Sequence, residues 1–254
     1  MSLPLSLRAE LLKTKRTASF YFTLVGAAVI PVTFILNFLM DGVMDHAIND
    51  PLNSIFKLHA EMNGLVIFPM FVVLICTLLP QLEYRNNTWK QVLSSPQEKK
   101  NIFLAKFLNI HLLMLLFLIA THVFLLVPVV MAHFMQPELN LLGRPLDGYT
   151  VWLRAGNSYV LGLALSALQF WLGMRFRNFI VPIAIGLGCW LVGTLMVFEF
   201  KSSVAPYFPY SYQAFSMSKQ YQPLLAQAGW TSLGYAIAFL VLGFIEFRRR
   251  RFVG

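Results

Sequence analysis

Two histidines are the side chains in this sequence best placed for cofactor chemistry. His111 and His122 lie eleven residues apart in a long run without Asp, Glu, Lys or Arg, so a helix would put them about three turns apart on nearly the same face. Such a pair could ligate two haems. Each haem would need an opposing axial ligand, however, and His46, His59 and His133 fall in or near expected loops. We therefore interpret the pair as hydrogen-bonding groups between helices, with a haem-binding or otherwise enzymatic intramembrane protein as the alternative.

Other catalytic signatures do not occur in the sequence. The His59-Ala60-Glu61 run lacks the second histidine of a zinc protease motif, and there is no Gly-x-Ser-x-Gly nucleophile elbow. A Walker loop is excluded because the chain has no Gly-Lys dipeptide, so it cannot hydrolyse ATP itself. Cys76 and Cys189 lie in apolar runs, which favours buried thiols over a disulfide. We predict no catalytic residue, metal or cofactor.

Long apolar runs are expected to form the helices that position the residues above. Of the 254 residues, 57% are hydrophobic and only 12% are charged, which is more apolar surface than a soluble core of this size buries. Runs of about 20 apolar residues cross a bilayer as helices, because hydrocarbon cannot satisfy backbone amides. We predict an all-α polytopic membrane protein, a single permease domain over residues 1–254. Its six predicted transmembrane helices are 20–40, 64–82, 107–136, 156–174, 179–198 and 220–245.

Basic residues set the predicted orientation. With the N-terminus inside, fifteen of the 20 Lys and Arg residues flank the helices on the cytoplasmic side and five on the other side. We therefore expect both termini in the cytoplasm of a bacterium and the chain in its inner (plasma) membrane. The net charge of +9 is spread over four segments, which favours membrane lipid headgroups over nucleic acid as its partner.

The N-terminal residues 1–19 are expected to form an interfacial helix. Leu5, Ala9 and Leu12 share one helical side and have basic residues around them, a pattern typical of a helix lying on the inner membrane surface. A plain cytoplasmic extension of the first transmembrane helix is the alternative.

The loop over residues 83–100 is the most informative one. Trp89, Val92 and Leu93 recur at three- and four-residue spacing, so they share one side of a short helix. The Ser-Ser-Pro run at 94–96 would end that helix. An exposed apolar stripe on a cytoplasmic loop needs a partner, and we favour a protein over the headgroup layer because tryptophan is frequent in binding hot spots.

With this loop, a basic amphipathic N-terminus and Lys106 early in the third helix, the sequence resembles the permease subunits of type-2 ABC exporters. The six-helix permeases of lantibiotic immunity and bacitracin export are the most similar kind. The resemblance implies that residues 83–95 are a coupling helix that docks on a separate ABC ATP-binding subunit, which binds and hydrolyses ATP. It also implies a second permease copy, or a related permease, and export of an amphipathic substrate. The expected docking residues are Glu83, Arg85, Thr88, Trp89, Val92 and Leu93.

The same resemblance implies an outer re-entrant segment over residues 199–225, which would close the exit. Three prolines interrupt helix formation there, and its aromatic residues suit a membrane interface. These aromatic residues are Tyr207, Phe208, Tyr210, Tyr212, Phe215 and Tyr221.

Four polar residues within the predicted spans remain: Asn37, Asn63, Thr121 and Gln169. We expect mainly packing contacts from them and keep a substrate pathway as the further possibility. A membrane module that binds a vitamin for an importer is the third functional reading. Such a module would dock through small residues on its membrane helices rather than through a loop with a tryptophan.

Overall fold

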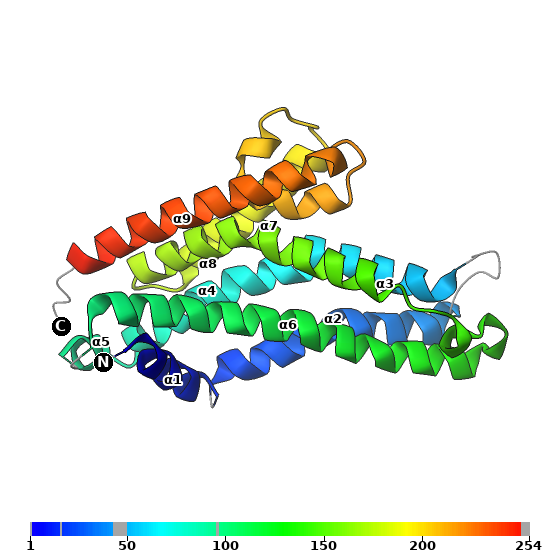
Figure 1. The fold of residues 1–254 in the computed structure, drawn as a ribbon, viewed down its shortest axis with the longest axis horizontal. Coiled ribbons are helices and arrows are strands. Elements are labelled where there is room, and N and C mark those ends of the chain that lie inside the picture. Colours follow the sequence, from blue (N-terminus) through cyan, green and yellow to red (C-terminus); the bar gives the residue numbers. More distant parts are fainter. Residues whose placement is uncertain (1, 16, 43–49, 95–96, 250–254) are drawn as a thin grey trace.

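The computed structural model describes residues 2–15, 17–42, 50–94 and 97–249, which form helices laid side by side and no strand (Figure 1). The α-helices are α1 (Leu3–Thr14), α2 (Ala18–Asp41), α3 (Pro51–Met62), α4 (Phe68–Arg85), α5 (Trp89–Ser94), α6 (Lys99–Met135), α7 (Gly148–Arg175), α8 (Ile180–Phe198) and α9 (Leu225–Arg249). A π-turn, η1 (Asn63–Ile67), joins α3 to α4. The 3-10 turns are η2 (Pro137–Leu139), η3 (Leu141–Gly143), η4 (Ala205–Tyr207), η5 (Pro209–Ser216) and η6 (Gln222–Leu224).

Five stretches of helix in the described residues are long and apolar enough to cross a membrane, which confirms an all-α polytopic membrane protein. They are Ala18–Met40, Pro51–Arg85, Lys99–Met135, Ile180–Phe198 and Gln222–Arg249. The predicted span at 156–174 lies in α7, which is 28 residues long but less apolar. Because α7 packs between α4 and α9, its Ser166 and Gln169 are fully buried and find partners within the protein. A sixth span therefore remains a prediction.

The second span is longer than the predicted 64–82 and begins at Pro51. The sequence places His59 in or near a loop, because it lies among charged and polar residues. In the structure His59 is fully buried, and its Nε2 lies 2.9 Å from the Thr121 hydroxyl of α6. Glu61 pairs with Arg154 of α7 at 3.5 Å. These partners come from distant parts of the chain, so local sequence cannot reveal that the polar segment is part of the bundle.

The π-turn in this span has a local cause. Pro69 has no backbone N–H, so the carbonyl of Leu65 cannot receive the usual helical hydrogen bond from it. The indole Nε1 of Trp190 in α8 donates to that carbonyl at 3.0 Å instead. The widened turn thus leaves the Leu65 carbonyl free to accept a hydrogen bond from Trp190, and this bond joins α8 to the second span.

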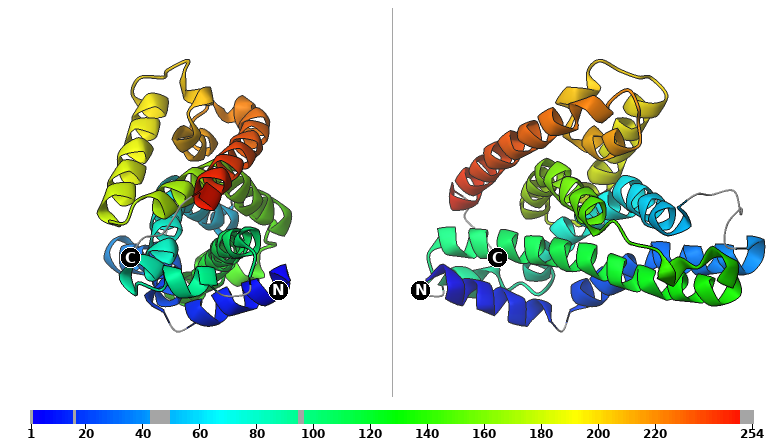
Figure 2. Two further views of the ribbon diagram at one scale, coloured as in Figure 1. Left: turned by 90° about the vertical axis from the view of Figure 1, so that its left-hand side faces the viewer. Right: turned by 45° about the vertical axis from the view of Figure 1, so that its right-hand side comes forward.

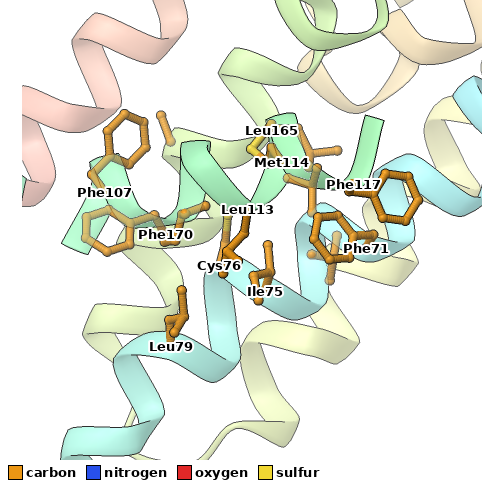
Figure 3. Packing of buried hydrophobic residues seen from close by; sticks show 14 of the residues in the cluster. Phe71, Ile75, Cys76, Leu79, Phe107, Leu113, Met114, Phe117, Leu165 and Phe170 are labelled. Atoms are coloured by element: carbon orange, nitrogen blue, oxygen red, sulfur yellow. The ribbon is translucent and has the colours of Figure 1, made fainter. Parts of the chain in front are cut away.

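The core lies where α4, α6 and α7 meet (Figure 3). Phe71 and Phe117 stack with ring centroids 4.4 Å apart, and Phe107 packs on Phe170 at 5.4 Å. Gly173 lets α7 approach α4 closely, because a Cβ there would lie 2.6 Å from the Cys76 carbonyl oxygen. The three helices are therefore held by aromatic packing and by one close backbone contact.

Helix α1, helix α5 and the last turns of α9 lie at the same end of the bundle (Figures 1 and 2). We call this the α5 end. Its helix α1 is separate from α2 and packs along the first half of α6. The polar side chains Ser6, Glu10 and Thr14 face inward, whereas Leu5 and Leu12 are exposed. The exposed leucines are compatible with a helix at the membrane surface, which stays a prediction.

The connection between α8 and α9 turns back into the protein. All seven residues from Pro209 to Phe215 are buried, and η5 packs against α7, α8 and α9. The Gln213 amide donates to the Ser158 carbonyl at 2.9 Å. Four of the six aromatic residues expected at the membrane interface, Tyr210, Tyr212, Phe215 and Tyr221, are instead buried in the protein, while Tyr207 is exposed. Closure of an exit by this segment remains a prediction.

Candidate functional site

Four charged side chains meet at the α5 end, between α1, α4 and α6. The Lys106 ammonium lies 2.9 Å from a carboxylate oxygen of Glu10 and 2.9 Å from one of Glu83. Lys13 bridges the same two carboxylates, at 2.9 Å from Glu10 and 2.8 Å from Glu83. The signs alternate around this group, which we call the charge cluster. Every member thus touches two opposite charges, the arrangement that best offsets the cost of removing charges from water.

The charge cluster is largely closed to solvent. The side chains of Lys106 and Glu83 are 2% and 5% exposed, whereas Lys13 is 43% exposed. Burial alone would lower the pKa of Lys13, but Glu10 and Glu83 outweigh that effect and raise it above its ordinary value. Lys13 therefore keeps its positive charge throughout the neutral range.

The predicted coupling helix is present as α5 and lies directly beside the charge cluster. A turn with Asn87 in the left-handed region (φ 52°) reverses the chain between α4 and α5. The Thr88 hydroxyl at the start of α5 donates to the second carboxylate oxygen of Glu83. The same carboxylate therefore holds the cluster lysines with one oxygen and α5 with the other.

The orientation of α5 differs from the one expected. The sequence predicts an exposed stripe, but Trp89 is only 4% exposed. Its ring packs on Tyr84 at 5.4 Å and on Phe247 of α9 at 5.8 Å, and the Lys106 ammonium lies 5.6 Å from its centroid. Trp89 is thus an internal anchor and not an exposed docking residue. The apolar ring faces inward because side chains of α4, α6 and α9 surround it there.

The outward side of α5 is polar. Gln91 and Ser94 of α5 are exposed, as is Arg85 at the end of α4, whereas Val92 is partly buried against the core. The side chain of Leu93 and the residues Ser95 and Pro96 lie outside what the structure describes. A groove of about 220 Å³ separates α5 from α1, with Glu10 and Lys13 on one wall, Gln91 and Val92 on the other, and Ile102 and Ala105 of α6 among its further lining residues.

A second polar contact at this end joins α7 to α9. The Trp171 indole donates to Glu246 at 2.7 Å, and the Arg175 side chain lies 3.9 Å from the same carboxylate. Phe247, the next residue of α9, packs against the ring of Trp89. A continuous set of contacts therefore links α1, α6 and α4 through α5 to α9 and α7.

The four predicted pathway residues do not form one group. Asn37 is exposed on α2, and Thr121 is bound to His59. The Gln169 amide donates to Thr77 and to the Pro182 carbonyl, while its oxygen accepts a hydrogen bond from Tyr210. This full set of bonds identifies Gln169 as a packing residue that ties α7 to α4, α8 and η5.

Asn63 is buried one turn after His59. The rings of His59 and His122 meet edge to face, with centroids 5.1 Å apart. That separation is too small for a porphyrin between them, so His59 does not supply the opposing haem ligand for His122. The second histidine of the sequence pair, His111, contacts the Tyr159 hydroxyl of α7 at 2.9 Å through its Nδ1.

Sequence reasoning found Glu83 and Lys106 but missed Glu10 and Lys13 as their partners. The available signal was the lysine itself, seven residues into an apolar helix, because such a cation requires a buried counter-charge. Spacing could not show which carboxylate supplies it. Glu10 is 96 residues away along the chain.

Comparison with known families gives the class of the protein. The sequence model described as ABC-2 family transporter protein matches residues 6–193, and the chain belongs to this family. A comparison with curated proteins finds no match. The matched range contains most of α1, all of α5, the charge cluster, the first three apolar spans and most of the fourth. The protein is therefore a multi-pass membrane permease subunit of an ABC transporter, a family that generally works with a separate ATP-binding subunit.

Proposed function

We propose that this chain is the permease of a bacterial ABC exporter that moves an amphipathic substrate, such as a peptide antibiotic or a lipid, out of the cytoplasm or the membrane. It acts in the plasma membrane with α5 and both termini on the cytoplasmic side. A partner subunit binds and hydrolyses ATP, and a second copy of the chain or a related permease completes the pathway. Lantibiotic immunity or bacitracin export is the nearest class of activity.

One observation carries this proposal: α5 is a short helix at the end of the bundle that is anchored on several membrane helices at once. Glu83 connects it to the charge cluster of α1 and α6, and Trp89 connects it to α9. A force applied to α5 by a moving ATPase would therefore reach four helices through short, stiff contacts. A loop without such anchors would absorb the motion instead.

The proposed docking surface differs from the sequence prediction in which residues touch the ATPase. Arg85 and Gln91, with Ser94, form the exposed side, and Val92 contributes through the groove beside α1. Glu83, Thr88 and Trp89 hold the helix in place from behind. Leu93 is retained as a docking residue on the strength of the family resemblance.

The nature of the membrane-facing surface supports an amphipathic substrate. Large apolar side chains cover the outsides of α2, α6 and α9, among them Leu36, Val123 and Val241. No group of three or more His, Cys, Asp or Glu residues suited to a metal ion occurs in the described part of the chain. The buried polar residues Gln169 and Thr121 already bind protein groups, so substrate recognition depends mainly on apolar contacts.

Co-purification tests the proposal. The tagged chain, extracted from its native membrane in mild detergent, should bring down an ATP-binding subunit in stoichiometric amount. The double substitution Arg85→Glu and Gln91→Glu should lower that ratio at least fivefold, because it reverses or adds charge on the docking side alone. Lys219→Glu, an exposed lysine between α8 and α9, is the matched control. Isolation of the wild-type chain with bound haem, or an unchanged ratio for the double variant, would contradict the proposal.

A further inference from the structure

A second hollow lies at the end of the bundle opposite α5, between the first turns of α3 and α7. Its volume is about 230 Å³, and it is partly open. Two cations, Lys57 and Arg154, line it together with two carboxylates, Asp50 and Asp147. Phe56 and Val151, which are 5% and 9% exposed, add apolar lining. The hollow therefore offers both signs of charge over an apolar base.

The walls of this hollow are held at a fixed separation by Asn53. Its amide nitrogen donates to Asp50 at 2.8 Å and to the Pro145 carbonyl at 3.1 Å, and its amide oxygen accepts from the backbone N–H of Asp147 at 2.9 Å. One side chain thus joins the start of α3 to the start of α7. A site built in this way keeps its shape before any ligand arrives.

The charged groups retain capacity for a ligand. Each aspartate caps its own helix, because Asp50 accepts from the Asn53 N–H at 3.4 Å and Asp147 accepts from the Thr150 N–H at 3.1 Å. Hydrogen bonds from Thr150 lower the pKa of Asp147 below its ordinary value, so this carboxylate is ionised at neutral pH. A carboxylate has about four lone-pair sites, so capping leaves room for an ammonium group. Lys57 is exposed and pairs with no carboxylate of the described residues. Arg154 pairs with Glu61 at 3.5 Å through one nitrogen, and a guanidinium has five N–H donors, so it keeps donors for a phosphate.

The four charged residues that line the hollow favour a position at the level of lipid headgroups, because charges in hydrocarbon are costly. The helix Pro51–Arg85 has 35 residues and is therefore about 52 Å long, whereas the hydrocarbon core is about 30 Å thick. At least one end of this helix therefore extends beyond the hydrocarbon core, and the charges of the hollow favour the end that begins at Pro51. Next to the lining residues Lys57 and Val151, Leu58 of α3 and Trp152 of α7 are 42% and 56% exposed and would meet acyl chains.

We propose that this hollow binds the zwitterionic headgroup of a phosphoethanolamine lipid. The phosphate lies against Lys57 and Arg154, and the ammonium group lies against Asp50 and Asp147. An anionic lipid satisfies only the cationic side and brings its charge close to two carboxylates. A soluble zwitterion gains nothing from Leu58 and Trp152, which favours the lipid. The site is independent of the partner ATPase.

Native mass spectrometry of the purified chain tests this proposal, with phosphatidylethanolamine or phosphatidylglycerol added to the detergent solution. The wild type should bind phosphatidylethanolamine more tightly. The double substitution Asp50→Asn and Asp147→Asn keeps both helix caps, because asparagine caps as well as aspartate. It should weaken phosphatidylethanolamine binding about fivefold and leave phosphatidylglycerol binding unchanged or tighter.

Two further variants complete the experiment. Lys57→Gln should weaken the binding of both lipids, and Lys219→Gln, an exposed lysine away from the hollow, should weaken neither. Circular dichroism melting of each variant checks that it is folded. If the double variant is unfolded, lipid binding by the single variant Asp147→Asn replaces it in the comparison. Equal binding of the two lipids by the wild type, or unchanged phosphatidylethanolamine binding in the aspartate variants, would overturn the proposal. Occupancy by soluble glycerophosphoethanolamine without lipid binding would also overturn it.

Discussion

At the scale of single residues, Lys106 is the centre of the α5 end. It lies about two turns into α6, where an unpaired ammonium would be costly, and two carboxylates from α1 and α4 surround it. The cluster has two positive and two negative members, so it is neutral as a whole. Each member depends on the others, because removal of one leaves an uncompensated buried charge.

Lys106→Met should therefore destabilise the protein strongly. Glu10 and Glu83 would keep Lys13 as their only cation in the cluster, and we expect a loss of about 3–5 kcal/mol in the free energy of unfolding. Denaturant titration in mixed micelles, followed by tryptophan fluorescence, measures it.

The control for this measurement is Lys219→Met, which removes an exposed lysine and should change stability by about 0.5 kcal/mol or less. The triple variant Glu10→Gln, Glu83→Gln and Lys106→Met should recover part of the lost stability, since it leaves no unpaired buried charge of this group except Lys13, which can reach water. A Lys106→Met variant as stable as the control would show that the cluster contributes nothing.

At the scale of elements, α5 is too short to be a stable helix by itself. Six residues cannot offset the cost of nucleating a helix, so tertiary contacts must hold it. The contacts of Trp89 with Tyr84 and Phe247 bury its ring almost completely. The order of α5 should thus depend on one side chain.

Trp89→Ala should release α5 while leaving the bundle folded. We expect the amides of residues 92–94 to exchange with solvent at least tenfold faster in hydrogen–deuterium exchange, because loss of the anchor favours local opening. Trp89→Phe keeps an aromatic ring and should show a smaller increase. Unchanged exchange in Trp89→Ala would mean that Thr88 and the backbone suffice to hold the helix.

The contact between η5 and α8 is a second element whose packing is testable. A Cβ at Gly193 would lie 2.7 Å from the backbone carbon of Tyr210, whereas a Cβ at Gly188 would meet nothing within 4 Å. Gly193→Ala should lower stability by about 1–3 kcal/mol, because neither backbone can yield easily.

Gly188→Ala is the matched control on the same helix. It should be neutral or stabilising by up to about 1 kcal/mol, since alanine loses less entropy than glycine in a helix. Thermal unfolding of the two variants in detergent decides the matter. Equal melting temperatures would show that η5 does not pack against α8 as described.

At the scale of the whole molecule, the charged groups are arranged asymmetrically. The α5 end contains α1, the last turns of α9, the charge cluster and the Arg175–Glu246 contact (Figure 1). The opposite end contains the first turns of α3 and α7 with the headgroup-sized hollow. This asymmetry supports a single orientation in the membrane.

Labelling of single cysteines tests that orientation and the number of spans. In a background with Cys76→Ala and Cys189→Ala, a membrane-impermeant maleimide applied to sealed cells should label Leu142→Cys and Lys219→Cys but not Gln91→Cys or Arg177→Cys. Leu142 and Arg177 lie beyond opposite ends of α7, so this pair shows whether α7 crosses the membrane. Labelling of Gln91→Cys from outside would reverse the orientation and rule out an ATPase contact at α5.

The sequence by itself determined that this is a helical membrane protein and where most of its spans lie. Five apolar runs became long helices, because hydrocarbon leaves a chain no other way to satisfy its backbone. The position of α5 between α4 and α6 was also predictable, since the Ser-Ser-Pro run ends any helix begun at Trp89. These features depend on residue type and on neighbours along the chain.

Only the tertiary structure decided which way the side chains face and which charges meet. A periodic stripe places Trp89, Val92 and Leu93 on one side of α5, but the site that receives Trp89 is made by Tyr84 and Phe247. Likewise, Lys106 requires a counter-charge, yet Glu10 lies in α1, 96 residues earlier in the chain. Local sequence fixes the spacing along a helix, whereas its rotation and its partners are set by long-range packing.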